Sequence, residues 1–308
     1  MAINTKADLA RSLRSSWINK HNKCVEFLAG NEDPHTKIHE IRKQFKQIRG
    51  LLRLLRYTDL DYKKYNKFYR DKGRDISYLR DSTSFVETLT GLYEQYQNGI
   101  DKVAYDTTMD YLLHHRSEML SSWSGTFDDL HGELIGFQRE IHEGISFRIT
   151  AFSQLERGLA KTYKRARKRL QLCMNDHYDE NYHELRKQIK YLRYQLQELK
   201  FLRHKFLVSY ETELELLSDL LGMDHDLENF SDFLLAHEHK IEAGPDMLKT
   251  IFKAISNHRM EMQKHALIQG EMVLTLDEKS YAHLYKRAWK ANRKAVKLKA
   301  RPLSEMVY

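Results

Sequence analysis

The sequence predicts an all-α fold, and three observations support this prediction. The chain has 308 residues but only three prolines, and a proline inside a helix costs about 3 kcal/mol. Apolar residues recur at steps of three and four, as at Leu214, Leu217 and Leu221, whereas alternation with a period of two is nearly absent. The hydrophobic fraction of 41% is enough to build a core. Long, uninterrupted helices are therefore expected along the chain.

Turn-forming residues divide this helical chain into segments of roughly 20–30 residues. The expected breaks are 30–34, 57–61, 98–99, 121–125, 177–181 and 244–245. Asp33 or Thr36 could cap the helix that follows the first break, and Asp179 or Asn181 could cap the helix that follows the fifth. Long antiparallel helices with short links are typical of helical bundles.

The chain also contains an internal repeat. The segment from His39 to Arg49 reads HEIRKQFKQIR, and the segment from His183 to Arg193 reads HELRKQIKYLR. Seven of the eleven positions are identical, and three of the other four exchange one apolar residue for another. The offset of 144 residues is nearly half of the chain. The sequence therefore predicts one domain over residues 1–308, built from two tandem halves at 1–145 and 146–308.

Helical geometry gathers the basic residues of each copy on one face and the apolar residues on the opposite face, because each residue advances by about 100°. The first basic stripe consists of His39, Arg42, Lys43, Lys46, Arg49, Arg53 and Arg56. The second basic stripe consists of His183, Arg186, Lys187, Lys190, Arg193 and Lys200. Gln197 stands where the first stripe has Arg53, so the second stripe is expected to bind more weakly at that end.

The two stripes indicate a binding surface for a polyanion. Like charges three or four residues apart repel by about 0.2–0.5 kcal/mol per pair, and Glu40 and Glu184 are the only acids within the two motifs. One basic stripe is commonly a solvated face, but the same residues in both halves favour a site. Arginine and lysine together suit phosphate oxygens. The net charge of +8 and the isoelectric point near 9.2 agree with an acidic partner, such as nucleic acid, anionic lipid or polyphosphate.

The pattern H-x-x-R-K-x-x-K-x-x-R, present twice in a helical chain, resembles the conserved histidine α-helical domain, or CHAD, over nearly the whole length. Arg80-Asp81, Leu221-Gly222 with Asp226, and the bases around Arg165 resemble further motifs of that family. One departure is Ile76-Ser77, where the family usually has Leu-Gly. The resemblance implies two four-helix bundles related by pseudo-twofold symmetry, whose basic helices face a shared groove that binds inorganic polyphosphate.

These observations predict that polyphosphate lies along a basic groove formed by both halves. The predicted binding residues are the whole first stripe, together with His183, Arg186, Lys187, Lys190 and Arg193 of the second and with Arg14, Arg80, Lys161 and Arg165 on neighbouring helices. The histidine at the head of each stripe is expected to donate to phosphate or to cap its helix. If its pKa lies near neutrality, binding should strengthen at lower pH.

Two other functions agree with the charge but lack the motifs or side chains that they would need. A phosphate-processing enzyme would need a phosphate loop or an acidic Mg²⁺ site, and Asp224, Asp226 and Glu228 come closest to such a site. Asp81 and Asp226 are instead expected to pair with bases across the bundle. A protein that binds nucleic acid would need exposed aromatic side chains among its lysine and arginine residues, so that nucleobases can stack on them. Beside the second motif, only Tyr191 and Tyr194 are available. The sequence therefore predicts a binding module that is not an enzyme and needs no metal or cofactor.

The cysteine count and the hydropathy pattern predict a cytoplasmic protein, and the polyphosphate binding that the resemblance implies would place it at polyphosphate granules. Cys24 and Cys173 are too few for a disulfide framework and lack the spacing of a metal site. The first residues include charges at Lys6, Asp8 and Arg11 and show no secretory signal. No apolar run is long enough to span a membrane.

Overall fold

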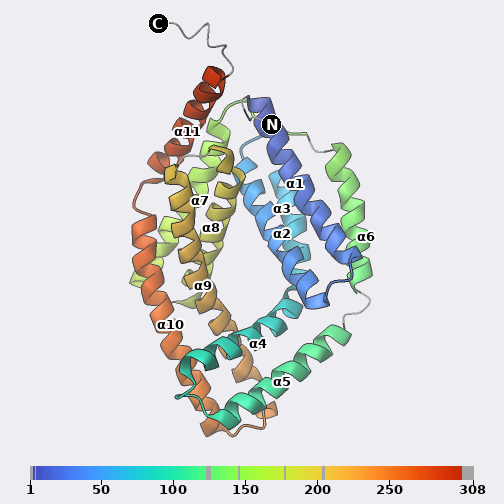
Figure 1. Ribbon diagram of the computed structural model, residues 1–308, viewed down its shortest axis with the longest axis vertical. Helices are drawn as coiled ribbons and strands as arrows, with labels where there is room; N and C mark the ends of the chain where they lie inside the picture. Colours follow the sequence, from blue (N-terminus) through green and yellow to red (C-terminus); the bar gives the residue numbers. More distant parts are fainter. Residues whose placement is uncertain are drawn as a thin grey trace.

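The computed structural model describes residues 3, 5–122, 126–144, 146–176, 178–202 and 205–299. Eleven α-helices contain most of these residues, and the described part of the chain includes no β-strand (Figure 1). The all-α prediction is confirmed.

The helices follow one another through short connections. The first six are α1 (Lys6–Ala29), α2 (Pro34–Leu55), α3 (Tyr62–Asp75), α4 (Ser77–Tyr96), α5 (Lys102–Ser121) and α6 (Thr126–Arg139), with a π-helical turn at Glu140–Gly144. The last five are α7 (Ser153–Asn175), α8 (Asp179–Glu198), α9 (Lys205–His237), α10 (Pro245–Val273) and α11 (Glu278–Lys299), with 3-10 turns at Lys200–Leu202 and Glu238–Lys240.

The expected breaks at 30–34, 57–61, 98–99 and 244–245 are confirmed. Those at 121–125 and 177–181 fall where α5 ends and α8 begins, although residues 123–125 and 177 lie outside the described residues. Three further junctions were not expected, namely Ile76 and the segments after α8 and α10. The Ile76 junction contains no glycine or proline, the residues that mark most breaks.

The two capping predictions have different outcomes. Asp33 caps α2, because its carboxylate accepts from the backbone N–H of Thr36 at 3.1 Å. The prediction for α8 is wrong: Tyr178 occupies the cap position and makes no side-chain cap hydrogen bond. Asp179 and Glu180 lie in the first turn of α8, where their negative charges interact favourably with the helix dipole.

The buried apolar residues form two clusters, and each draws on both sequence halves. The larger cluster joins residues such as Trp17 and Phe45 to Leu192 and Tyr285. The smaller one lies where α4 and α5 meet α9 and α10, at the lower end of Figure 1, and includes Phe85. Neither cluster belongs to one half alone. The division at 145/146 remains a prediction.

Helix α2 lies at the centre of the larger cluster, in contact with α1, α3, α7 and α8. Two glycines allow these helices to approach closely: a Cβ atom on Gly158 of α7 would lie 2.3 Å from the carbonyl oxygen of Leu54, and one on Gly50 would lie 2.7 Å from Cβ of Tyr194. Gly50 and Tyr194 occupy the same position in the two repeats. A twofold relation between the repeats would produce such a contact, and the symmetry itself remains a prediction.

Candidate polyanion-binding groove

A groove with a volume of about 460 Å³ runs between α2 and α8 and is bordered by α4 and α9. We call it the central groove. The stripe residues that line it are His39, Arg42, Lys43, Lys46, Arg186, Lys190 and Arg193. Its remaining lining residues are Gln47, Arg80, Asp81, Ser84, Tyr194, Gln197, Asp219, His225, Asp226 and Asn229.

The sequence places these bases in the groove because each motif is amphipathic. Ile41 and Ile48 on α2, and Leu185 and Leu192 on α8, are fully buried, so the basic faces of the two helices turn away from the core. The one acid of each motif contacts the same repeat position: Glu40 pairs with Lys43 at 3.1 Å, and Glu184 pairs with Lys187 at 2.6 Å.

The central groove is strongly cationic. Seven lysine or arginine residues and three aspartates line it, which gives a net charge of +4 when its histidines are neutral. Several of the arginines have acidic partners: Arg186 lies 3.7 Å from Asp226, Arg80 lies 2.7 Å from Glu87, and Arg193 pairs with Glu215.

Lys46 and Lys190, which occupy the same repeat position, differ from these arginines. Among the described residues, no carboxylate lies within ion-pair distance of either ammonium group. Burial, together with Arg42, Lys190 and Arg186, lowers the pKa of Lys46 well below its usual range. Burial and Arg186 lower the pKa of Lys190 to about 8. Two cations are thus held close together without a paired carboxylate.

Three arginines in the groove retain unused donors. The Nε atoms of Arg42, Arg186 and Arg193 are buried and have no acceptor among the described residues. One terminal nitrogen of Arg42 donates to the carbonyl of Gly73 at 2.9 Å, which holds the guanidinium in place. A buried donor without an acceptor costs about 1–3 kcal/mol. An anion in the groove could accept from these groups.

The two head histidines lie in different environments. His39 lines the groove with its side chain 51% exposed, whereas His183 does not line it. Nδ1 of His183 lies 3.1 Å from Nδ1 of His225, which does line the groove. Burial lowers the pKa of His39, and it lowers that of His183 to about 4 and that of His225 to about 3. These shifts move all three pKa values further below neutrality, so the condition for stronger binding near neutral pH, a histidine pKa close to 7, is not met.

The C-terminal part of the first stripe is used for packing. Arg53 is only 9% exposed, lies 3.7 Å above the ring of Tyr191 and donates to Asn66 at 2.8 Å. Arg49 lies 3.4 Å from the same Asn66 oxygen, and Arg56 donates to Thr162 at 3.3 Å. The first stripe therefore enters the groove only as far as Lys46, because α3, α7 and α8 cover the rest.

The other predicted binding residues lie outside the lining of the central groove. Lys187 is paired with Glu184, and Arg14 of α1 donates to the carbonyl of His142 at 2.7 Å. Lys161 and Arg165 are exposed on α7. Burial, together with cations that include Arg165, lowers the pKa of Arg56 to about 10, so Arg165 lies close to the covered end of the first stripe.

Helices α7 and α11, which pack against each other, form a second basic region. Their sequences contain seven and eight lysine or arginine residues, with one glutamate each. Together they carry a net charge of +13, against +8 for the whole chain. Lys161 and Arg165 belong to this region, which attracts anions over a longer range than direct contacts do.

Sequence reasoning anticipated two acids of the groove, Asp81 and Asp226, and missed the third, Asp219. The expected pairing of Asp226 with a base is confirmed by its contact with Arg186. Asp81 lies near Arg42 and Lys46, and burial raises its pKa against their influence. Asp219 and His225 were not expected. Their only signal is that each lies within about one helical turn of the Leu221-Gly222 motif on the same helix.

No group of three or more histidine, cysteine, aspartate or glutamate side chains in the described residues is arranged to hold a metal ion. Within the same residues, every helix is too short or too polar to cross a lipid bilayer. Cys24 and Cys173 are buried and free.

Comparison with known proteins bears on the family to which the chain belongs. The chain has no match among curated proteins. The family model described as the CHAD domain matches residues 18–235. This segment is more than half of the 308 residues and contains both basic stripes. The chain therefore belongs to the CHAD domain family.

Proposed function

We propose that the central groove binds inorganic polyphosphate and does not turn it over. The observation that carries this proposal is the pair formed by Lys46 and Lys190, two half-buried lysines at the same repeat position without a carboxylate within ion-pair distance among the described residues. Such a pair destabilises the free protein and becomes favourable when an anion lies between the two groups. Membership of the CHAD family supports polyphosphate as that anion.

Polyphosphate suits the groove because it carries a charge on every unit. The lysine and arginine residues of α2 and α8 offer many contacts to negative charge. They do not distinguish one chemical group from another along a polymer. A chain that contacts both stripes at once gains avidity from two linked sites. Its outer units could reach Arg165 and Lys161 on α7, which lie on the basic region beyond the covered end of the first stripe.

Titration with polyphosphates of several chain lengths, at two salt concentrations, tests the proposal. We expect affinity to increase with length and to decrease with salt, because bound cations are released from the polymer. Short DNA serves as competitor at equal phosphate concentration. Displacement of long polyphosphate by DNA would contradict the proposal.

The aromatic residues of the second motif argue against DNA. Tyr191 is 7% exposed and its ring lies under the guanidinium of Arg53. Tyr194 packs against Gly50. Tyr191 therefore presents no open face on which a nucleobase could stack. Tyr194 is the only tyrosine, phenylalanine or tryptophan among the groove-lining residues, so the groove lacks the succession of rings on which neighbouring nucleobases stack.

The absence of turnover and the cellular location belong to the same proposal. Release of phosphate from polyphosphate in the presence of Mg²⁺, at a rate proportional to protein concentration, would show that the protein is an enzyme. We further propose that the protein lies in the cytoplasm at polyphosphate granules. A fluorescent fusion should co-localise with stained granules and should disperse in cells that make no polyphosphate.

The affinity for polyphosphate should fall as the pH rises through about 8, the pKa of Lys190. The protonated ammonium binds the polymer, and the neutral amine that forms above this pH does not. Replacement by arginine, Lys190→Arg, keeps the charge at high pH. We expect this variant to lose less affinity than the wild type between about pH 7 and pH 10, as measured by calorimetric titration.

Deprotonation of Lys190 does not itself destabilise the fold. The pKa of Lys190 is lower in the folded protein than its ordinary value of 10.5, so its protonation opposes folding below about pH 8. This cost disappears as the pH rises toward 10.5. Deprotonation of Lys190 therefore increases the stability of the fold in the same pH range in which it decreases the affinity for polyphosphate. Equal pH profiles for the wild type and Lys190→Arg would refute the assignment.

The Lys46→Met variant should become more stable while it binds polyphosphate less tightly. Methionine removes a half-buried charge that lies near Arg42, Arg186 and Lys190 and keeps a similar side-chain length. We expect the free energy of unfolding to increase by about 1–2 kcal/mol, measured by urea denaturation without ligand.

Lys43→Met is the matched control, because Lys43 lies one turn earlier on α2 with its side chain 48% exposed and paired with Glu40. Its stability should change by less than about 0.5 kcal/mol. A decrease in the stability of Lys46→Met would show that the Lys46 side chain stabilises the free protein. That result would contradict the proposal that its charge is retained for binding at a cost in stability.

A further inference from the structure

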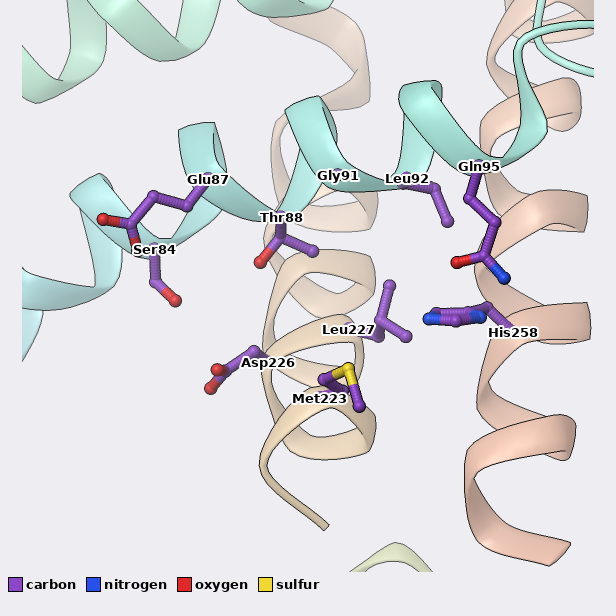
Figure 2. Close-up of a pocket in the computed structure, with 10 residues that line it drawn as sticks. All are labelled: Ser84, Glu87, Thr88, Gly91, Leu92, Gln95, Met223, Asp226, Leu227 and His258. Atoms are coloured by element: carbon purple, nitrogen blue, oxygen red, sulfur yellow. The ribbon is translucent and has the colours of Figure 1, made fainter. Parts of the chain in front are cut away.

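A second cavity, which we call the side pocket, adjoins the central groove. It has a volume of about 300 Å³ and lies between α4, α9 and α10 (Figure 2). Ser84 and Asp226 line both the side pocket and the groove. The volume is at the lower end of the range for small-molecule sites, about 300–1,000 Å³.

Two arginine–carboxylate pairs mark the boundary between the two cavities. Arg80 and Arg186 line the groove, whereas their partners Glu87 and Asp226 line the side pocket. A ligand that crosses this boundary meets arginine donors on one side and carboxylate acceptors on the other. The chemistry fits a phosphate chain joined to a group that carries hydroxyls.

The inner part of the side pocket is less polar. Leu92, Leu227 and Met223 provide apolar surface, and Figure 2 shows the amide of Gln95 next to the imidazole of His258 at the end far from Glu87 and Ser84. An amide can both donate and accept hydrogen bonds. A flat, apolar ring with polar edges fits this combination better than a sugar alone does.

Gly91 supplies an independent observation. It lies inside α4, where glycine costs about 1 kcal/mol relative to alanine, yet a Cβ atom there would meet no atom within 4 Å. Packing therefore does not require glycine at this position. Gly91 lines the side pocket, one turn from Thr88 and from Gln95, so a larger side chain there would occupy the cavity.

We propose that the side pocket binds the nucleoside part of a nucleoside polyphosphate whose phosphates lie in the central groove. The base contacts Leu92, Leu227 and Met223, and the ribose hydroxyls donate to Asp226 and Glu87. The phosphates lie on Arg80 and Arg186. This inference rests on the proposed function, because it requires that the groove bind phosphate chains.

Comparison of ATP with inorganic tripolyphosphate tests the inference, because the two share a chain of three phosphates and differ in the nucleoside. We expect ATP to bind about tenfold more tightly, the equivalent of about 1.4 kcal/mol from burial of the base. Gly91→Leu should abolish this advantage and leave tripolyphosphate binding unchanged. Gln95→Ala, which removes the amide without filling the cavity, should reduce it in part.

Gly132→Leu is the matched control, since Gly132 also lies inside a helix, and a Cβ atom on it would meet no atom within 4 Å. It should bind both ligands as the wild type does. If long-chain polyphosphate fails to bind in a parallel titration, the proposed function is wrong. If long-chain polyphosphate binds but neither ATP nor tripolyphosphate does, the side-pocket inference is wrong. If tripolyphosphate binds but ATP has no advantage, or if the advantage survives in Gly91→Leu, the side-pocket inference is wrong and the groove is unaffected.

Discussion

Reversal of two charges, Lys46→Glu together with Lys190→Glu, should weaken polyphosphate binding by about a thousandfold. The two ammonium groups lie at the same repeat position on opposite walls of the groove, and neither has a carboxylate partner among the described residues. A charge-assisted hydrogen bond contributes about 1.5–3 kcal/mol, and each glutamate would also repel the polymer. Calorimetric titration with long-chain polyphosphate measures the effect.

The matched control reverses the same number of charges elsewhere. Lys253 and Lys264 are exposed on α10 and line none of the cavities described above. Lys253→Glu with Lys264→Glu has the same net charge as the test variant, so a general loss of attraction would appear in both. We expect the control to lose less than about tenfold. Circular dichroism should show equal helix content, and unchanged affinity in the test variant would exclude the groove as the binding site.

The Gly158→Ala variant should lower the free energy of unfolding by about 3 kcal/mol. A Cβ atom at this position would lie 2.3 Å from the carbonyl oxygen of Leu54 and 3.1 Å from that of Arg53. Both obstacles are backbone atoms of α2, which cannot rotate away as a side chain can. The clash is relieved only if α2 and α7 separate, and that separation opens the larger hydrophobic cluster. Urea denaturation measures the change.

Gly136→Ala provides a control for the intrinsic effect of alanine. Gly136 is exposed in α6, and a Cβ atom there would meet nothing within 4 Å. The substitution should stabilise the protein by up to about 1 kcal/mol, because alanine favours a helix more than glycine does. Equal effects of the two substitutions would show that α2 and α7 do not pack as closely as described.

Much of the fold follows from local features of the sequence. The near absence of proline and the three- and four-residue spacing of apolar residues determine the helices, and the Asp33-Pro34 pair determines where α2 begins. The junction at Ile76 could not be predicted, because no residue there disfavours a helix by itself. That junction depends on how α3 and α4 pack, and Ile76 is buried at 1% exposure.

The binding site could be predicted only where one helix face determines it. The repeat identified Arg42, Lys46, Arg186 and Lys190, which all line the groove. It could not show that Arg53 stacks on Tyr191, because that contact depends on how α2 crosses α8. The acids and His225 come from α4 and α9, whose positions beside the groove follow from tertiary packing. Such contacts leave no periodic signal in the sequence.

The walls of the groove are distant in sequence, and this has a consequence during synthesis. The two basic stripes are 144 residues apart, so α2 leaves the ribosome well before α8. During that interval the nascent chain presents one stripe, which offers a polyanion half of the cationic contacts and no opposing wall. If the groove binds a polyanion as proposed, we expect tight binding only after translation has passed α8 and the two helices have met at Gly50 and Tyr194. Retention on a polyphosphate resin should then separate completed, folded chains from unfinished ones.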